Sequence, residues 1–134
     1  MSFSGWQLQK NRKTVQGEIE NALKVISRSK IRIPVHGSGR TDSGVHAYGQ
    51  VAHFDLDTKL DSSELCNAIN SNTAKECKIM SVVESDNGFE SRFDARKRWY
   101  RYQVYKGSSI LYRNQAWLIN DIDVSLLRLV SKII

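Results

Sequence analysis

Long apolar runs are missing from this chain of 134 residues. No stretch of about 18 consecutive apolar residues occurs, so no segment is long enough to cross a bilayer as a helix, and no membrane partner is expected. The first residues, Met1 to Trp6, also lack a basic stretch followed by an apolar one, which is the pattern of a secretory signal. We therefore expect a cytoplasmic protein.

Cysteine is scarce as well. Cys66 and Cys77 are the two cysteines, and neither lies in a recognisable catalytic signature. In a chain without an export signal, two such thiols are expected to stay reduced. We therefore interpret both as buried or incidental residues.

Acidic residues are the minority charge. The chain has 14 Asp and Glu against 20 Lys and Arg, which gives a net charge of +6. Such a balance favours a polyanionic partner, most often nucleic acid, although an ordinary basic domain can carry the same charge. Hydrophobic residues make up 40% and charged residues 25% of the chain, which suits one domain with a single modest core over residues 1–134.

Hydrophobic periodicity predicts three helices and four strands. The helices are expected over residues 14–29, from a capping box at Asp61, and from a cap at Asp123. The last helix should bury Leu126, Leu127, Val130 and Ile133. The strands are expected over residues 31–37, 50–56, 79–83 and 98–106, with a turn at 86–88. One face of the second strand should carry Ala52, Phe54 and Leu56. This order is typical of an α+β fold, with helices on one face of a mainly antiparallel sheet.

A glycine-rich loop is expected over residues 37–48. Within it, Arg40 and Asp42 are two residues apart, a spacing that allows an ion pair. An arginine near a carboxylate keeps it ionised, and an ionised carboxylate can act as a nucleophile. A lone aspartate among glycines is more often a turn former, so these residues alone leave both roles open. The glycine spacing matches neither the dinucleotide fingerprint nor the P-loop.

A metal site is a further alternative for this region. His46, His53 and Asp55 are residue types that bind divalent metals, and they lie within ten positions of one another. Isolated histidines are usually structural, so we expect no metal here. A metal-binding or purely structural domain nevertheless remains the third class of interpretation.

A basic and aromatic segment lies near the end of the predicted fold. Its members are Arg92, Phe93, Arg96, Lys97, Arg98, Trp99, Tyr100, Arg101 and Tyr102. On a strand, Arg98, Tyr100 and Tyr102 would share one face, where a cation could neutralise phosphate and an aromatic ring could stack on a base. An edge strand guarded by cations would have the same composition, so RNA binding is one of two readings.

Several segments together resemble the tRNA pseudouridine synthase A family. The residues that carry the resemblance are Gly39-Arg40-Thr41-Asp42-Ser43-Gly44-Val45-His46-Ala47, then Gly49-Gln50-Val51-Ala52-His53-Phe54, the opening Phe3-Ser4-Gly5-Trp6-Gln7, and Phe93-Asp94-Ala95-Arg96 with Tyr100-Arg101-Tyr102. Ser38 and Ser43 stand where the family usually has alanine. The resemblance covers nearly the whole chain but about half of the family's length.

This resemblance implies a site and a reaction. Asp42 would be the catalytic aspartate, Arg40 would orient it, and Tyr100 would stack on the target base, with Arg98 and Tyr102 beside it on the substrate. The reaction would convert uridine to pseudouridine at tRNA positions 38 to 40, in the anticodon stem-loop, without metal or cofactor. The family acts as a homodimer on tRNA, and Trp6 would lie near the RNA.

The resemblance also implies that parts of the family's fold lie outside this chain. Relative to the family, the chain would be a ferredoxin-like half of the enzyme without its first strand and its carboxy-terminal half. A separate chain would then be one source of the missing half. The alternative is an inactive fragment or an RNA-binding remnant of such an enzyme.

Overall fold

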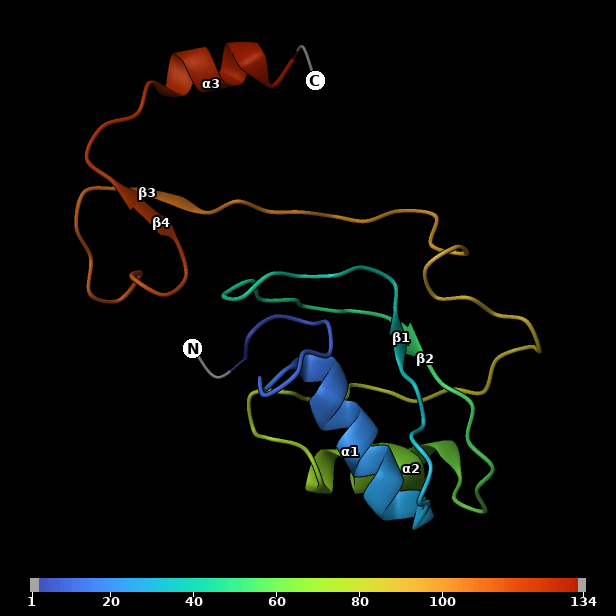
Figure 1. The fold of residues 1–134 in the computed structure, drawn as a ribbon. Coiled ribbons are helices and arrows are strands. Elements are labelled where there is room, and N and C mark those ends of the chain that lie inside the picture. The colour runs from blue at the N-terminus through green and yellow to red at the C-terminus, as the bar shows by residue number, and fades with distance from the viewer. Residues whose placement is uncertain (1–2, 133–134) are drawn as a thin grey trace. The chain divides into compact units, whose positions relative to one another are not determined.

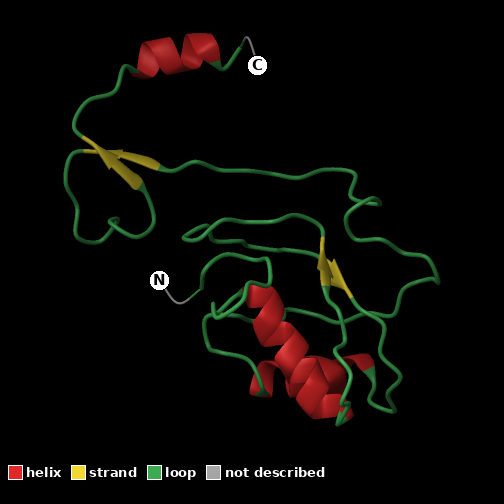
Figure 2. Ribbon diagram, in the orientation of Figure 1, coloured by secondary structure: helices red, strands yellow, loops and turns green. Residues whose placement is uncertain are grey.

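The computed structural model describes residues 3–132 and divides the chain into two compact units, Met1–Arg96 and Lys97–Ile134. Figure 1 labels the elements in chain order, and Figure 2 colours them by type. They are α1 (Val15–Ser27), β1 (His36–Gly37), β2 (Ala52–His53), α2 (Ser62–Ser71), β3 (Val104–Lys106), β4 (Trp117–Ile119) and α3 (Val124–Val130). The described chain is therefore a mixed arrangement of three helices and two small sheets. None of the described helices has the length and apolar character needed to cross a membrane.

The core of the first unit forms where α1 packs against α2. The predicted helix over residues 14–29 is confirmed as α1, which begins because the Thr14 side chain accepts a hydrogen bond from the Gly17 amide. It ends at Arg28, whose φ of 52° is left-handed. The buried hydrophobic residues of the unit are Trp6, Ile19, Ala22, Leu23, Val35, Leu65 and Ile69.

The predicted capping box is confirmed at the start of α2. The Asp61 side chain accepts a hydrogen bond from the Glu64 amide at 2.8 Å, and the Glu64 carboxylate accepts one from the Asp61 amide at 3.1 Å. Each side chain satisfies a backbone donor that the helix leaves unpaired. Just past α2, the amide of Ala74 donates to the Glu18 carboxylate at 2.8 Å, which ties the segment to α1.

The two strands of the first unit form an antiparallel pair in which His36 lies opposite His53. The residues predicted to share one face of the second strand, Ala52, Phe54 and Leu56, all pack against the core. Regular strand structure covers only two residues on each side, so the predicted strands over 31–37 and 50–56 are too long. Pro34 explains part of the difference, since proline has no amide proton to donate to a ladder.

The predicted strand over residues 79–83 is wrong. Ile79 and Val82 do pack against the core, but Asn70 on α2 takes the place of a neighbouring strand. Its side chain accepts from the Ile79 amide at 2.8 Å and donates to the Ile79 carbonyl at 2.9 Å. The predicted turn at 86–88 is confirmed by a hydrogen bond of 3.1 Å from the Phe89 amide to the Asp86 carbonyl.

The second unit contains β3, β4 and α3. Its two strands pair in parallel, with Val104 opposite Trp117, so the expectation of a mainly antiparallel sheet is wrong here. The predicted strand over 98–106 is regular only from Val104. The cap of α3 is confirmed, because the Asp123 side chain accepts from the Leu126 amide at 2.9 Å. The face expected to be buried is exposed at Leu126, Leu127 and Val130, and Ile133 lies outside the described residues.

Candidate active site on the loop between β1 and β2

The strand pair β1–β2 closes the base of a long loop that carries Asp42 (Figure 1). Beyond the strands, the amide of Ser38 donates to the Val51 carbonyl at 2.8 Å. The Gln50 side chain accepts from the Ser38 hydroxyl at 2.8 Å and donates to the Gly39 carbonyl. These bonds hold Ser38 and Gly39 against Gln50 and Val51 where the loop leaves the strands, and we call this part of the loop the pinned neck.

Asp42 lies exposed in a turn at the far part of this loop. The amide of Val45 donates to the Asp42 carbonyl at 3.2 Å, and Gly44 has a φ of 86°, a left-handed conformation that glycine adopts without strain. The turn-forming role and the exposed carboxylate are thus both present at this residue. An exposed carboxylate on a hydrogen-bonded turn can be presented to a ligand as large as RNA.

The ion pair that the spacing of Arg40 and Asp42 allows is not formed. Among the described residues, Arg32–Glu20 and Lys106–Asp121 are ion pairs, and neither Arg40 nor Asp42 has such a partner. Arg40 and Asp42 are both exposed, and an ion pair in water gains little to offset the ordering of two side chains. The spacing allowed the pair, but the loop conformation does not bring it about.

The residues on either side of Asp42 are held by the segment before α1. The Thr41 carbonyl accepts a hydrogen bond from the Trp6 amide at 2.9 Å. The Ser43 hydroxyl donates to the Phe3 carbonyl at 3.3 Å. Trp6 is only 5% exposed and belongs to the hydrophobic core of the first unit. Sequence periodicity gave no sign of this support, because the partners lie far apart in the sequence.

A buried carboxylate connects α1 to the segment that leads into β1. Glu20 accepts hydrogen bonds from the Val35 amide at 3.0 Å, from Gln16 at 3.0 Å, and from two nitrogens of Arg32 at 2.7 and 2.8 Å. Burial alone would raise the pKa of Glu20, but these hydrogen bonds, with that from Arg32 foremost, leave the pKa below its ordinary value. The ionised form of Glu20 is therefore the form that stabilises the fold.

The histidines proposed for a metal site have other surroundings. His53 stacks on His36 with ring centroids 5.1 Å apart, and its Nδ1 accepts a hydrogen bond from the Ser91 amide at 3.1 Å. The Ser91 hydroxyl lies 3.0 Å from the same nitrogen and donates to the His36 carbonyl at 2.8 Å. His46 and Asp55 are exposed, and within the described part of the chain no three metal-binding side chains come together. The geometry gives His53 a structural role.

The other predicted substrate-binding residues belong to the second unit. Tyr100 and Tyr102 are 70% and 91% exposed, and Arg98 is exposed as well. All three precede the regular part of β3, so the sheet face that they were expected to share does not form. An exposed, extended segment with cations and aromatic rings is still suited to contact single-stranded nucleic acid.

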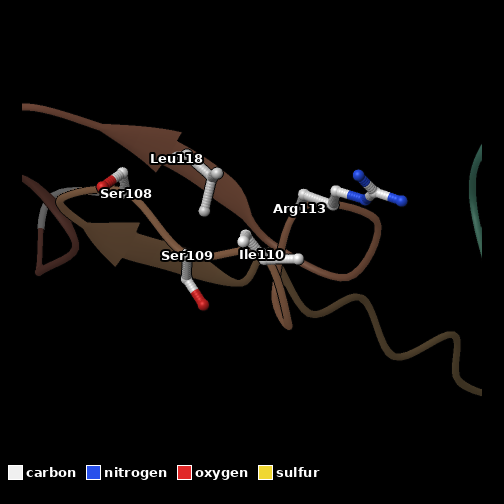
Figure 3. Close-up of a pocket in the computed structure, with 5 residues that line it drawn as sticks. All are labelled: Ser108, Ser109, Ile110, Arg113 and Leu118. Atoms are coloured by element: carbon white, nitrogen blue, oxygen red, sulfur yellow. The ribbon is translucent and has the colours of Figure 1, made fainter.

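The second unit has a hollow of about 490 Å³. Figure 3 shows the residues that line it. It is lined by Ser108, Ser109, Ile110, Arg113 and Leu118. The guanidinium group of Arg113 extends away from the other four side chains. No residue predicted for the site lines this hollow, and it offers no pair of ionisable groups for acid–base chemistry.

Comparison with known proteins assigns a class to this loop and fold. Residues 2–94 match the family model described as tRNA pseudouridine synthase. The chain is 44% identical over 117 residues to tRNA pseudouridine synthase A of Bacillus subtilis (strain 168), covering 86% of this chain and 47% of that protein. It is 44% identical over 125 residues to the protein of the same name from Ehrlichia chaffeensis (strain Arkansas), covering 90% of this chain and 50% of that one.

A third relative is similar over the same part of the chain. The tRNA pseudouridine synthase A of Pseudothermotoga lettingae is 41% identical over 118 residues, which cover 87% of this chain and 47% of that protein. This chain belongs to the tRNA pseudouridine synthase family. It spans about half the length of the curated relatives that it matches.

Proposed function

We propose that this chain is the aspartate-bearing part of an enzyme that isomerises uridine to pseudouridine in tRNA. The observation that carries the proposal is the match of residues 2–94 to the tRNA pseudouridine synthase family, within which the loop presents an exposed Asp42. The net charge of +6 suits a polyanionic substrate. The position of Asp42 after Gly39-Arg40-Thr41 is where the family resemblance puts its catalytic aspartate.

The proposed reaction is an isomerisation that needs no redox partner. The target nucleotide leaves its stack, at a cost of a few kcal/mol, and the Asp42 carboxylate acts on the nucleoside. The bond between C1′ and N1 breaks, the uracil turns, and a bond forms between C1′ and C5. N1 gains a proton and C5 loses one, so the atoms balance without metal or organic cofactor.

The remaining residues would bind and orient the substrate. Arg40, two positions before Asp42, is free of an ion pair among the described residues and can meet a phosphate or fill the gap left by the target base. Tyr100 offers a ring for stacking on the uracil, and Arg98 and Tyr102 flank it in the sequence. We also propose that the target uridines are those at positions 38 to 40 of the anticodon stem-loop. The enzyme would act as a homodimer in the cytoplasm. A further half of the enzyme, in the same or in a separate chain, would complete the site.

The test measures pseudouridine formation on a tRNA transcript with uridine at positions 38 to 40. The chain is assayed alone and joined to the carboxy-terminal half of the Bacillus subtilis relative. The matched control is the same transcript with cytidine at those three positions. Pseudouridine in the first transcript and none in the control supports both the reaction and its location. Binding of tRNA without any product in either form of the protein would favour the RNA-binding remnant instead.

A further inference from the structure

The residues on both sides of Asp42, Thr41 and Ser43, form hydrogen bonds with the segment that precedes α1. The Thr41 carbonyl accepts from the Trp6 amide at 2.9 Å, and the Ser43 hydroxyl donates to the Phe3 carbonyl at 3.3 Å. In Figure 1 this blue segment runs between α1 and the loop between β1 and β2. Asp42 itself has an exposed side chain, so its direction depends on how this backbone is held.

Gly5 lies directly against the peptide that leads into Asp42. A Cβ atom at this position would lie 2.6 Å from the Thr41 carbonyl oxygen and 3.2 Å from the carbonyl carbon of Asp42. Both distances are too short for ordinary contact, and the neighbouring atoms are backbone rather than a flexible side chain. Any residue larger than glycine here must therefore displace the loop or the segment itself.

Trp6 fixes the same loop at its neck. Its ring packs on the bare Cα of Gly37, where a Cβ atom would lie 2.5 Å from ring atoms Cε2 and Cζ2. Gly37 ends β1 and is followed by Ser38, the first residue of the pinned neck. The Trp6 ring and the Trp6 amide thus hold the loop at two separate points.

The segment is in turn anchored to the core helix. The Gly5 carbonyl accepts from the Val15 amide at 3.2 Å, and the Trp6 carbonyl accepts from the Gln16 amide at 3.1 Å. These amides belong to the first turn of α1, where backbone donors lack partners within the helix. A continuous chain of contacts therefore runs from the first turn of α1, through Gly5 and Trp6, to the peptide of Asp42.

We propose that Gly5 and Trp6 are positioning residues of the active site, which set the direction of the Asp42 carboxylate without touching the substrate. This inference rests on the proposed function, because the direction of the Asp42 carboxylate matters only if Asp42 takes part in the reaction. A carboxylate that must reach one atom of a flipped nucleoside loses rate steeply when it is displaced, and a shift of about 1 Å can cost about 100-fold. Binding of tRNA through phosphates depends little on such a shift.

The decisive variant is Gly5→Ala, compared with two glycine controls. Gly88 has a φ of 97° and Gly5 a φ of 91°, so alanine is strained to a similar degree at both, but nothing lies within 4 Å of a Cβ at Gly88. Gly49 has neither a positive φ nor a neighbour within 4 Å. Gly88→Ala therefore reproduces the strain without the contact, and Gly49→Ala reproduces the added methyl group alone.

Two readouts separate positioning from loss of fold. In the enzyme completed with the Bacillus subtilis half, we expect Gly5→Ala to lower the single-turnover rate about 10- to 100-fold with KM and tRNA affinity unchanged, while both controls keep the rate. In the 134-residue chain, amide hydrogen exchange at Trp6 and Val45 should become faster in Gly5→Ala than in Gly88→Ala. The exchange readout needs no activity, so it tests the positioning contacts even if the proposed reaction is absent.

The opposite results overturn the inference. If the rate of Gly5→Ala equals that of Gly88→Ala in an active enzyme, Gly5 does not position Asp42. If the completed enzyme with its native Gly5 makes no pseudouridine, the proposed function fails. In that case, equal rates of amide hydrogen exchange at Trp6 and Val45 in Gly5→Ala and Gly88→Ala would show that Gly5 does not hold the loop either.

Discussion

At the scale of single residues, the contacts that matter most connect positions far apart in the sequence. Asp42 could be singled out because the run from Gly39 to Ala47 is distinctive and local. The sequence could not show that Asp42 forms no ion pair with Arg40, because the pair depends on backbone conformation rather than on spacing. Likewise, no pattern indicated that Glu20 would meet Arg32 and the Val35 amide, 12 and 15 positions away.

Glu20 gives a prediction about stability and pH. Replacing it by Gln keeps the shape but removes the charge that receives hydrogen bonds from Arg32, Gln16 and the Val35 amide. We expect Glu20→Gln to lower the free energy of unfolding by about 1–3 kcal/mol at pH 7. Glu84→Gln, which changes an exposed carboxylate outside the helices and strands, serves as a control.

The pH dependence follows from the lowered pKa of Glu20 in the folded state. Its ordinary value is 4.5, so the carboxylate contributes fully to stability above that pH. The contribution is lost as the pH falls through the lower folded pKa. Chemical denaturation of the unsubstituted protein and of Glu20→Gln should be measured between pH 7 and pH 3. The difference between their free energies of unfolding should shrink towards zero as the pH falls. A difference that stays constant or grows in acid would contradict this account of Glu20.

At the scale of elements, helices were more predictable than strands. The second and third helices begin at the expected caps, Asp61 and Asp123, and the first begins within one residue of its expected start, because a cap and its helix lie within a few residues of each other. Strand length depends on distant partners. Residues 79–83 meet the side chain of Asn70 instead of a neighbouring strand, and this could not be read from their own β-rich composition.

The basic and aromatic segment gives a prediction about RNA binding. If its cations neutralise phosphates, the affinity for tRNA should fall steeply as salt increases, because counterions are released on binding. Tyr100→Ala should weaken binding by about 1–3 kcal/mol if the ring stacks on a base. Tyr112→Ala is the control, since Tyr112 already stacks on Tyr105 with ring centroids 5.2 Å apart. An affinity that is the same at low and high salt would refute the electrostatic part.

At the scale of the whole molecule, the two units differ in how much they bury. All the buried residues of the described chain belong to the first unit. In the second unit, the apolar side chains of α3 are between 43% and 60% exposed. An exposed apolar helix of this kind is suited to pack against further protein. Without such packing, the second unit has little hydrophobic stabilisation of its own.

This difference predicts unequal resistance to proteolysis. In limited digestion of the 134-residue chain, early cleavage should fall within residues 97–134, and a fragment close to residues 1–96 should persist. Joining the chain to the carboxy-terminal half of the Bacillus subtilis relative should protect the second unit if that half covers α3. Cleavage at equal rates in both units would show that the second unit is as stable as the first.

The catalytic role of Asp42 is the central claim, and one substitution tests it most directly. Asp42→Asn keeps the size and the backbone of the residue but removes the nucleophilic carboxylate. In the completed enzyme, single-turnover pseudouridine formation should vanish, while affinity for tRNA stays within about twofold of the unsubstituted protein. Asp57→Asn, which changes another exposed aspartate of the first unit, should leave both quantities intact. Measurable pseudouridine formation by Asp42→Asn would contradict the assignment.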